Sequence, residues 1–286
     1  MIAVKHNNSI GIIQNLKGFL DENGESLIEL MSEIGIETLQ VLVNESSCHL
    51  LSKENAEKLL KMVEGKLRIT SLWAGWHSGN SVWNFVEGPS TLGIVPEHTR
   101  AARMKELKAD IDFANLLGVK NVATHVGFIP EQPCYAEYQG VVDAVAELAD
   151  YCGKYGMHFN FETGQETPVT LMRTIADIGR ENLGVNLDPA NLIVYGRANP
   201  IDAIDIYGNR IRSVHVKDGN YPKDDYHKLG KQVVVGEGTV NFPVFLPKLL
   251  DSGYKGDLYI EHEISGRDEE RINDIKNTVK FIKSLM

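Results

Sequence analysis

The sequence predicts an α/β fold, the (β/α)8 TIM barrel, from three observations. Short apolar runs that suit buried strands alternate with amphipathic segments along all 286 residues. The alternation repeats about eight times, and this chain length is typical of one such barrel. Several predicted helices end in a glycine just before the next strand, as at Gly35, Gly65, Gly118, Gly156 and Gly253. We therefore expect residues 1–286 to form a single domain.

The predicted strands are short apolar runs, and the segments between them carry apolar residues at helical spacing. An open doubly wound sheet is the alternative, but no Gly-x-Gly-x-x-Gly follows the first strand, so nothing supports a dinucleotide-binding version. The predicted strands are Ile10–Asn15, Thr38–Asn44, Leu67–Trp73, Asn121–Val126, His158–Glu162, Gly184–Asp188, Ile211–Lys217 and Leu258–Glu263.

Composition excludes several classes of protein. A net charge of -10 and a pI of about 5.4 disfavour binding to nucleic acid. No apolar run reaches membrane-spanning length, and MIAVKHNNSIG at the start lacks the apolar core of a signal peptide. Cys48, Cys134 and Cys152 show no C-x-x-C spacing, which favours reduced thiols. We expect a cytoplasmic protein with no membrane or nucleic-acid partner.

Polar side chains end four consecutive predicted strands. Glu162, Asp188, His215 and Glu261 each alternate with apolar neighbours, so the apolar set should face the helices and the polar set the barrel interior. Active sites of such barrels lie at the carboxyl ends of the strands. The four side chains are therefore predicted to meet in one pocket.

Three carboxylates and one imidazole suit a divalent metal ion. Mn²⁺ is favoured, and Co²⁺, Mg²⁺ or Zn²⁺ fit the same ligand types. Without a cation, three converging carboxylates would repel one another and some would protonate. The alternative is that each residue is simply a hydrogen-bonded polar group of the barrel interior.

Five motifs in order, NFETG, NLDPAN, SVHVKDG, VGEGTVNF and YIEHE, give the sequence a resemblance to a known family. Over essentially the whole chain it resembles the xylose-isomerase-like TIM barrels, the superfamily of sugar and sugar-phosphate isomerases and epimerases, inosose dehydratases and apurinic endonucleases. The resemblance implies that Glu162, Asp188, His215 and Glu261 bind one metal ion. It also implies that Glu162 and Glu261 are the acid–base pair, that the substrate is a sugar or sugar phosphate, and that the protein is a homo-oligomer.

The expected chemistry is removal of a proton α to a carbonyl. A metal ion chelated by the carbonyl and a neighbouring hydroxyl stabilises the resulting enediolate. Glu162 and Glu261 would approach from opposite sides of the barrel mouth, one taking the proton and the other returning it. Return to the opposite face gives epimerisation, and return to the neighbouring carbon gives aldose–ketose isomerisation.

Five further residues are expected to contact the substrate: Trp73, Trp76, His125, Asn191 and Lys217. The tryptophans would stack on a sugar face, with rim packing as the alternative. Ketose epimerases often carry arginine at the position of Lys217, and many relatives carry histidine at that of Asn191, which leaves the substrate end open. For His125, a structural hydrogen bond is an equally good interpretation.

Residues beside the predicted ligands are expected to support them. Asp218 and Glu237 are assigned this role, with Glu237 orienting His215 or Lys217. The alternative for Lys217 is an ion pair with Asp218 or Glu237.

The connection after the third strand, from His77 to about Pro96, is a candidate lid that carries Trp83 and Phe85. Loops on a rigid barrel vary with the substrate, so this segment is expected to set specificity. A cationic set could form an anion site or only a solvated rim: Lys223, Lys228, Lys231 and Arg267.

Three other functions remain open. A lyase or dehydratase of the same fold shares the proton abstraction, but a group β to the carbonyl then leaves. An apurinic endonuclease would use three zinc ions, and Asp225 and His227 faintly resemble its Asp-x-His signature. A non-catalytic barrel that binds a sugar or a partner subunit is the last alternative, and the intact four-residue set argues against it.

Overall fold

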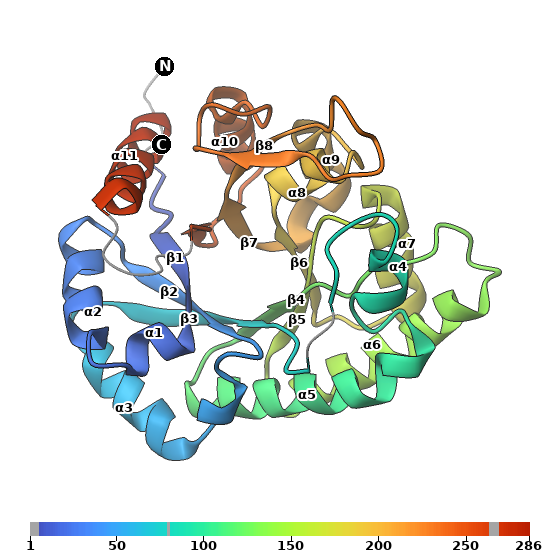
Figure 1. Cartoon of the computed structure of the whole chain (residues 1–286), viewed down its shortest axis with the longest axis horizontal. Coiled ribbons are helices and arrows are strands. Elements are labelled where there is room, and N and C mark those ends of the chain that lie inside the picture. The colour runs from blue at the N-terminus through green and yellow to red at the C-terminus, as the bar shows by residue number, and fades with distance from the viewer. Residues whose placement is uncertain (1–5, 79–80, 263–268) are drawn as a thin grey trace.

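The computed structural model describes residues 6–78, 81–262 and 269–286 (Figure 1). Eight parallel strands close into a barrel in the order β1-β10-β7-β6-β5-β4-β3-β2, which confirms the predicted fold. The barrel strands are β1 (Ile10–Asn15), β2 (Thr38–Val43), β3 (Arg68–Ala74), β4 (Asn121–Thr124), β5 (His158–Glu162), β6 (Leu183–Leu187), β7 (Ile211–Val216) and β10 (Leu258–Ile260).

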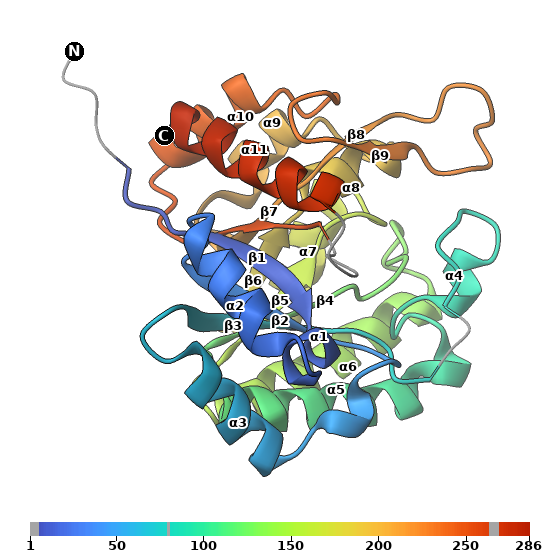
Figure 2. The ribbon, with the colours of Figure 1, turned by 60° about the vertical axis from the view of Figure 1, so that its left-hand side comes forward.

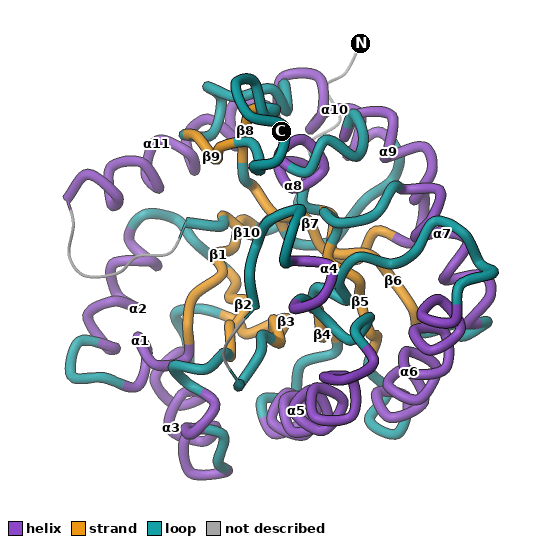
Figure 3. Tube along the Cα trace, turned by 45° about the vertical axis from the view of Figure 1, so that its right-hand side comes forward, coloured by secondary structure: helices purple, strands orange, loops and turns teal. Residues whose placement is uncertain are grey.

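Helices surround this barrel, as Figure 3 shows. They follow the strands in turn, so each crossover returns the chain to the same end of the sheet. The α-helices are α1 (Leu16–Leu20), α2 (Gly24–Glu33), α3 (Lys53–Val63), α4 (Gly88–Thr91), α5 (Glu97–Leu116), α6 (Ala136–Gly153), α7 (Pro168–Ile178), α8 (Pro189–Val194), α9 (Pro200–Tyr207), α10 (Phe242–Asp251) and α11 (Glu269–Leu285), and two short 3-10 turns are η1 (Cys48–Leu50) and η2 (Gly208–Arg210). No helix in the described ranges is long and apolar enough to cross a membrane.

The strands divide their side chains as the alternation predicts. Phe159 and Phe161 of β5 belong to the apolar core, whereas Asn160 and Glu162 of the same strand are buried polar residues. Polar side chains of the interior bond across neighbouring strands, as Gln40 does to Ser71 at 3.0 Å. Because these strands are buried on both faces, interior polar groups must find partners among themselves. The barrel interior is therefore a polar network.

The observed strands end within one residue of the predicted ends, except for two strands that end earlier. β4 ends at Thr124, so His125 begins the following loop. β10 ends at Ile260, and Glu261 is the next residue. Glu263, the predicted end of that strand, lies outside the described residues. Both residues thus lie just beyond a strand, where a loop can direct the side chain into the barrel mouth.

An additional hairpin, absent from the predicted elements, extends the seventh strand. β8 (Asp218–Asn220) pairs antiparallel with β9 (Lys231–Val233). Its base is fixed by the Asp218 carboxylate, which accepts backbone N–H bonds from Gly236 and Gly238 at 3.0 Å and from Val240 at 3.1 Å. A Cβ at position 238 would lie 2.1 Å from Asp218 Oδ1, so glycine is required there. These contacts account for the second glycine of the VGEGTVNF motif.

The candidate lid is fastened to α5 by a buried arginine. Arg103 is 3% exposed and donates to the Thr91 carbonyl at 2.6 Å, to Ser81 Oγ at 3.1 Å and to the Gly93 carbonyl. Its guanidinium also lies 4.7 Å from the Trp76 ring centroid. In Figure 2 this α4 segment and the β8–β9 connection project on the same side of the molecule. Together they flank the carboxyl ends of the strands.

Candidate metal and substrate site

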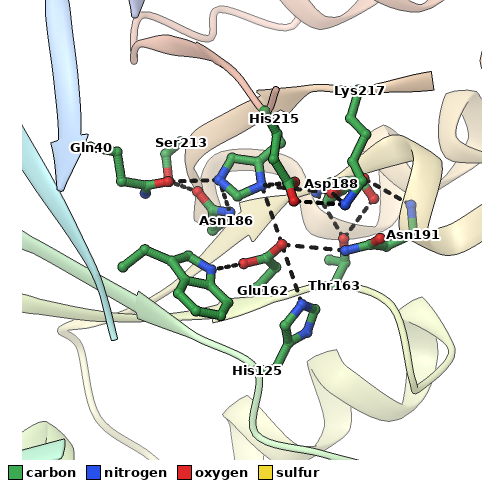
Figure 4. Close-up of polar contacts among 12 residues, drawn as sticks. Gln40, His125, Glu162, Thr163, Asn186, Asp188, Asn191, Ser213, His215 and Lys217 are labelled. Carbon is green, nitrogen blue, oxygen red and sulfur yellow. Dashed lines mark hydrogen bonds and ion pairs between the residues drawn. The ribbon is translucent and has the colours of Figure 1, made fainter. Parts of the chain in front are cut away.

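The structure brings the four predicted metal ligands together. One ligand atom from each of Glu162, Asp188, His215 and Glu261 lies within 4.8 Å of the others. His215 Nδ1 is 3.2 Å from Glu162 Oε1, 3.0 Å from Glu261 Oε2 and 3.6 Å from Asp188 Oδ2. Figure 4 shows His215, Glu162 and Asp188 converging at the centre of this group. We call these four residues the carboxylate–histidine cluster.

A chain of hydrogen bonds fixes which nitrogen of His215 faces the cluster. The Ser71 hydroxyl donates to the Asn121 carbonyl at 3.2 Å, so its oxygen accepts from Gln40 Nε2. Gln40 Oε1 then points at His215 Nε2, 2.7 Å away, and needs a proton there. Asn186 Nδ2 is 3.1 Å from the same nitrogen, but the shorter contact favours the Nε2–H form. Nδ1 thus faces the three carboxylates, and in the neutral imidazole its lone pair could bind a metal ion. With no ion between them, burial acts to lower the pKa of His215, but Glu162 and the other two carboxylates outweigh it and raise that pKa well above its usual value, so Nδ1 then carries a proton.

The cluster fits a divalent ion because three of its buried atoms have no hydrogen-bond partner. These atoms are His215 Nδ1, Asp188 Oδ2 and Glu261 Oε2. They lie close to one another, yet no donor in the described part of the chain satisfies them with hydrogen-bond geometry. Leaving such atoms buried and unpaired is costly, and a cation shared between them removes the cost. Oxygen ligands with one nitrogen suit Mn²⁺, Mg²⁺ and related ions.

Electrostatics within the cluster depends on its cations. Burial acts to raise the pKa of Glu162, but His125 and His215 outweigh it and lower that pKa well below its usual value. Burial likewise acts to raise the pKa of Glu261, and Lys217 and His215 reverse the effect. For Asp188 burial prevails, and its pKa is raised despite Lys217. Two of the three carboxylates therefore stay charged only because positive groups lie beside them.

Lys217 is paired inside the cluster. Its Nζ lies 2.8 Å from Glu261 Oε1 and 3.4 Å from Asp188 Oδ2, and its side chain is 12% exposed. The alternative of an ion pair with Asp218 or Glu237 is wrong, because Asp218 is occupied by backbone N–H groups and Glu237 is exposed. Lys217 also lines the cavity described below, so its ammonium can face a substrate.

Three side chains hold Glu162 in place. Trp73 Nε1 donates to Glu162 Oε2. Asn191 Nδ2 donates to Glu162 Oε1 at 3.3 Å, and His125 Nε2 lies 3.4 Å from that oxygen. His125 Nδ1 is in turn 3.1 Å from Gln165 Oε1. Three of the predicted substrate residues therefore contact Glu162, and Lys217 contacts the other two carboxylates.

A cavity of about 530 Å³ opens above the cluster. Glu162, Glu261 and all five residues predicted to contact the substrate line it: Trp73, Trp76, His125, Asn191 and Lys217. Asp218 and Glu237 do not. Trp83 also lines the cavity, is 43% exposed, and has its ring centroid 5.0 Å from that of His125. The sequence places Trp83 on the lid, but its contact with His125 had no signal in the sequence.

The described residues that suggested a nuclease zinc site or an anion site lie outside the cluster and do not line the cavity. Asp225 Oδ1 accepts from the backbone N–H of His227 at 3.0 Å within one exposed turn. Within the described ranges, neither joins a group that could hold a metal ion. Arg267 lies outside the described residues, and Lys223, Lys228 and Lys231 do not line the cavity.

Comparisons with known proteins agree with the fold. The sequence profile of the xylose isomerase-like TIM barrel family matches residues 28–285. A xylose isomerase domain protein from Planctomyces limnophilus has a similar structure, with a TM-score of 0.86 and 29% identity over 98% of each chain. An uncharacterised protein from Methanocaldococcus jannaschii is 25% identical over 86% of this chain and 81% of its own length.

Relatives with a stated activity are more distant or partial. Inosose dehydratase from Geobacillus kaustophilus is 27% identical over 45% of this chain and 46% of its own length. The crystal structure of D-allulose 3-epimerase from Methylomonas in complex with D-allulose has a TM-score of 0.70 at 16% identity, covering 99% of both chains. This second likeness shows the fold alone.

Proposed function

The chain belongs to the xylose isomerase-like TIM barrel family, and from that premise we propose that it is a metal-dependent sugar isomerase or epimerase. The observation that carries the proposal is the pair of carboxylates, Glu162 and Glu261, that lie 3.2 and 3.0 Å from one nitrogen of His215 and also line the cavity. In our proposal, a sugar carbonyl bound above the cluster lies within reach of both carboxylates.

The two glutamates differ in ways that suit different roles. Glu162 is 2% exposed and held by Trp73 and Asn191, whereas the Glu261 side chain is 25% exposed and held by Lys217. They enter from β5 and from the end of β10, with β6 and β7 between them. In our proposal one takes the α-proton and the other returns it, which gives epimerisation or, at the neighbouring carbon, isomerisation.

Glu162, Asp188, His215 and Glu261 would hold the ion, and Mn²⁺ is our proposed metal. When bound, a divalent ion supplies the positive charge that stabilises an enediolate. The chain supplies the rest: Gln40 sets the tautomer of His215, and His125 and Lys217 offer N–H donors to substrate oxygens. Trp73, Trp76 and Trp83 give the cavity an aromatic lining.

Dehydration is the second candidate, and the partial match to inosose dehydratases favours it. The same proton abstraction would be followed by loss of a hydroxyl or glycosyl group β to the carbonyl. Lys217, an ammonium at the cavity wall, is a donor that could assist a departing oxygen. The product separates the two functions, because elimination yields an unsaturated product and epimerisation does not.

The first experiment measures metal per chain by inductively coupled plasma mass spectrometry after dialysis against limiting Mn²⁺ and Zn²⁺. We expect one ion in the wild type and weakened retention in Glu261→Gln. Glu45→Gln is the matched control, because Glu45 lines the cavity but lies outside the cluster. No retained metal under any loading would refute the proposal.

The second experiment follows deuterium uptake from heavy water into a panel of ketoses with Mn²⁺-loaded protein. Uptake without elimination supports the isomerase or epimerase, and an eliminated product supports the dehydratase. The expectations of one domain over residues 1–286, of a cytoplasmic location and of a homo-oligomer stay predictions.

A further inference from the structure

The cavity above the cluster is larger than one sugar ring requires. A dry cavity of about 150 Å³ accommodates benzene, so roughly 25 Å³ serve each non-hydrogen atom. By this measure about 530 Å³ hold roughly twenty-one non-hydrogen atoms, against about twelve in a hexose and about twenty-three in a disaccharide. A single ring that reaches the cluster would leave nearly half of the space for something else.

The side chains that line the cavity are buried at its floor and exposed at its rim. At the floor, Glu162 is 2% exposed and His125 is 5% exposed. At the rim, Trp83 is 43% exposed, and Glu45 and Ser78 are also exposed. We call Asn44, Glu45, Ser78, Ser81 and Trp83 the outer wall; its members follow β2 and β3 and line the cavity.

The hydroxyls of two outer-wall serines are already bonded within the chain: Ser78 Oγ donates to Glu106 at 2.6 Å, and Ser81 Oγ accepts from Arg103 at 3.1 Å. The outer wall therefore offers a ligand the Asn44 amide N–H, the Glu45 carboxylate and the open indole face of Trp83. These groups recognise a ring with hydroxyl substituents, since an indole packs against the ring face while short polar side chains bond to its edge. Trp83 is well placed for this contact because its ring lies beside His125, and His125 lies beside Glu162. A second ring attached to the first would therefore reach Trp83.

The charges of the described lining residues disfavour a phosphate. Three are carboxylates, Glu45, Glu162 and Glu261. The basic lining residues are Lys217 and His125, and both already face carboxylates of the cluster. Arg271 lines a separate cavity that shares Gln232 and Glu261 with this one. A phosphoryl group at the outer wall would face the Glu45 carboxylate. Arg103 donates to Ser81 Oγ there, but it is 3% exposed and its guanidinium also donates to the Thr91 and Gly93 carbonyls.

We propose that the outer wall is a subsite for a second, uncharged ring, so that the substrate is a glycoside or disaccharide. The inference rests on the proposed function in one respect, namely that the first ring sits at the cluster. Trp83 is the residue that distinguishes the two-ring ligand from the single ring.

Binding affinities test this subsite separately from catalysis. Isothermal titration calorimetry with Mn²⁺-loaded protein would measure the dissociation constant of each sugar. Two pairs compare a monosaccharide with a disaccharide, D-glucose with maltose and D-fructose with lactulose. Two further pairs compare D-glucose and D-fructose with their 6-phosphates. We expect the disaccharide of at least one pair to bind tenfold or more tightly than its monosaccharide, and the phosphates to bind no better than the free sugars. Trp83→Ala should remove the preference for the disaccharide and leave monosaccharide affinity within about twofold.

Val86→Ala is the matched control, because Val86 belongs to the same loop, is 70% exposed and does not line the cavity. Equal affinities within both pairs, tighter binding of the phosphates, or no measurable binding of any sugar would overturn the subsite. Deuterium uptake is read in parallel. A disaccharide preference without uptake would contradict only the proposed function, and uptake without the preference would contradict only the subsite.

Discussion

Lys217 Nζ lies 2.8 Å from Glu261 Oε1 and 3.4 Å from Asp188 Oδ2, so one buried ammonium serves two carboxylates of the cluster. Removing one partner of a buried ion pair typically costs about 3–5 kcal/mol, because the remaining charge is left uncompensated. Glu162 adds a third carboxylate to the same space. The ammonium therefore lowers the repulsion that the cluster would otherwise carry.

We predict that Lys217→Met lowers the melting temperature of chelator-treated protein and enlarges the rise caused by Mn²⁺. The ion would then supply charge that Lys217 no longer provides. Differential scanning calorimetry with and without Mn²⁺ measures both effects, and Lys217→Arg, which keeps the charge, is the control. Equal Mn²⁺-induced shifts in Lys217→Met and wild type would contradict the prediction.

Gln40 is predicted to control metal affinity through His215. In Gln40→Leu the Nε2–H loses its acceptor, and the Nδ1 lone pair is no longer fixed toward the carboxylates. Loss of such a supporting contact typically weakens metal binding by about 10- to 100-fold. Competition with a fluorescent chelator measures the dissociation constant. Glu45→Gln, at an exposed side chain of the same cavity that lies outside the cluster, should bind metal as the wild type does.

Trp73 is predicted to position Glu162 for proton transfer. Trp73→Phe keeps the aromatic ring but removes the N–H that reaches Glu162 Oε2. We expect deuterium exchange to fall by about tenfold or more, since a misplaced base transfers protons slowly. Trp76→Phe provides the comparison, because Trp76 lines the same cavity and its Nε1 has no hydrogen-bond partner. Similar losses in both variants would show that ring packing, not the N–H, matters.

Asp110 and His77 are predicted to make stability depend on pH. Burial raises the pKa of Asp110 to about 7, although its bond with His77 acts against this. For His77, burial acts to lower the pKa, but Asp110, whose Oδ1 lies 2.8 Å from Nε2, outweighs it and the pKa is raised. Both groups thus hold protons more tightly when folded, so the free energy of unfolding falls as pH rises from about 4 to above 7.

Asp110→Asn removes the larger part of this dependence. Urea unfolding measures the free energy of unfolding of both proteins between about pH 5 and pH 8. Over this range the wild type should lose on the order of a few kcal/mol relative to Asp110→Asn, since one unit of pKa corresponds to about 1.4 kcal/mol. A constant difference between the two proteins across this range would refute the assignment.

Much of the fold follows from local patterns, because strands buried on both faces and glycine-ended helices are visible in the sequence. His158–Glu162 was predicted with its observed bounds, and the convergence of Glu162, Asp188, His215 and Glu261 follows from the geometry of strand ends in a barrel. The supporting contacts could not be read in the same way. Gln40 and His215 are 175 residues apart, and no local pattern records which interior side chains bond across a closed barrel.

The β8–β9 hairpin was not predicted, for a different physical reason. β8 and β9 are three residues each, too short for an alternation to be visible, and their base depends on Asp218 meeting distant backbone N–H groups. The same limit applies to Lys217, whose partners Asp188 and Glu261 come from other strands, while the nearer Asp218 in sequence is directed elsewhere.

The cluster comes from residues 162–261, whereas the outer wall comes from residues 44–83. In our proposal, catalysis and ligand selection are therefore encoded in separate stretches of the gene. Recombination that exchanges the first half of the barrel between related sequences would leave the ligands intact and bring in a new rim, as long as the contacts of Gln40 and Trp73 are kept. In protein engineering, the boundary between these two stretches is the natural crossover point for combining the ligand specificity of one protein with the catalytic residues of another.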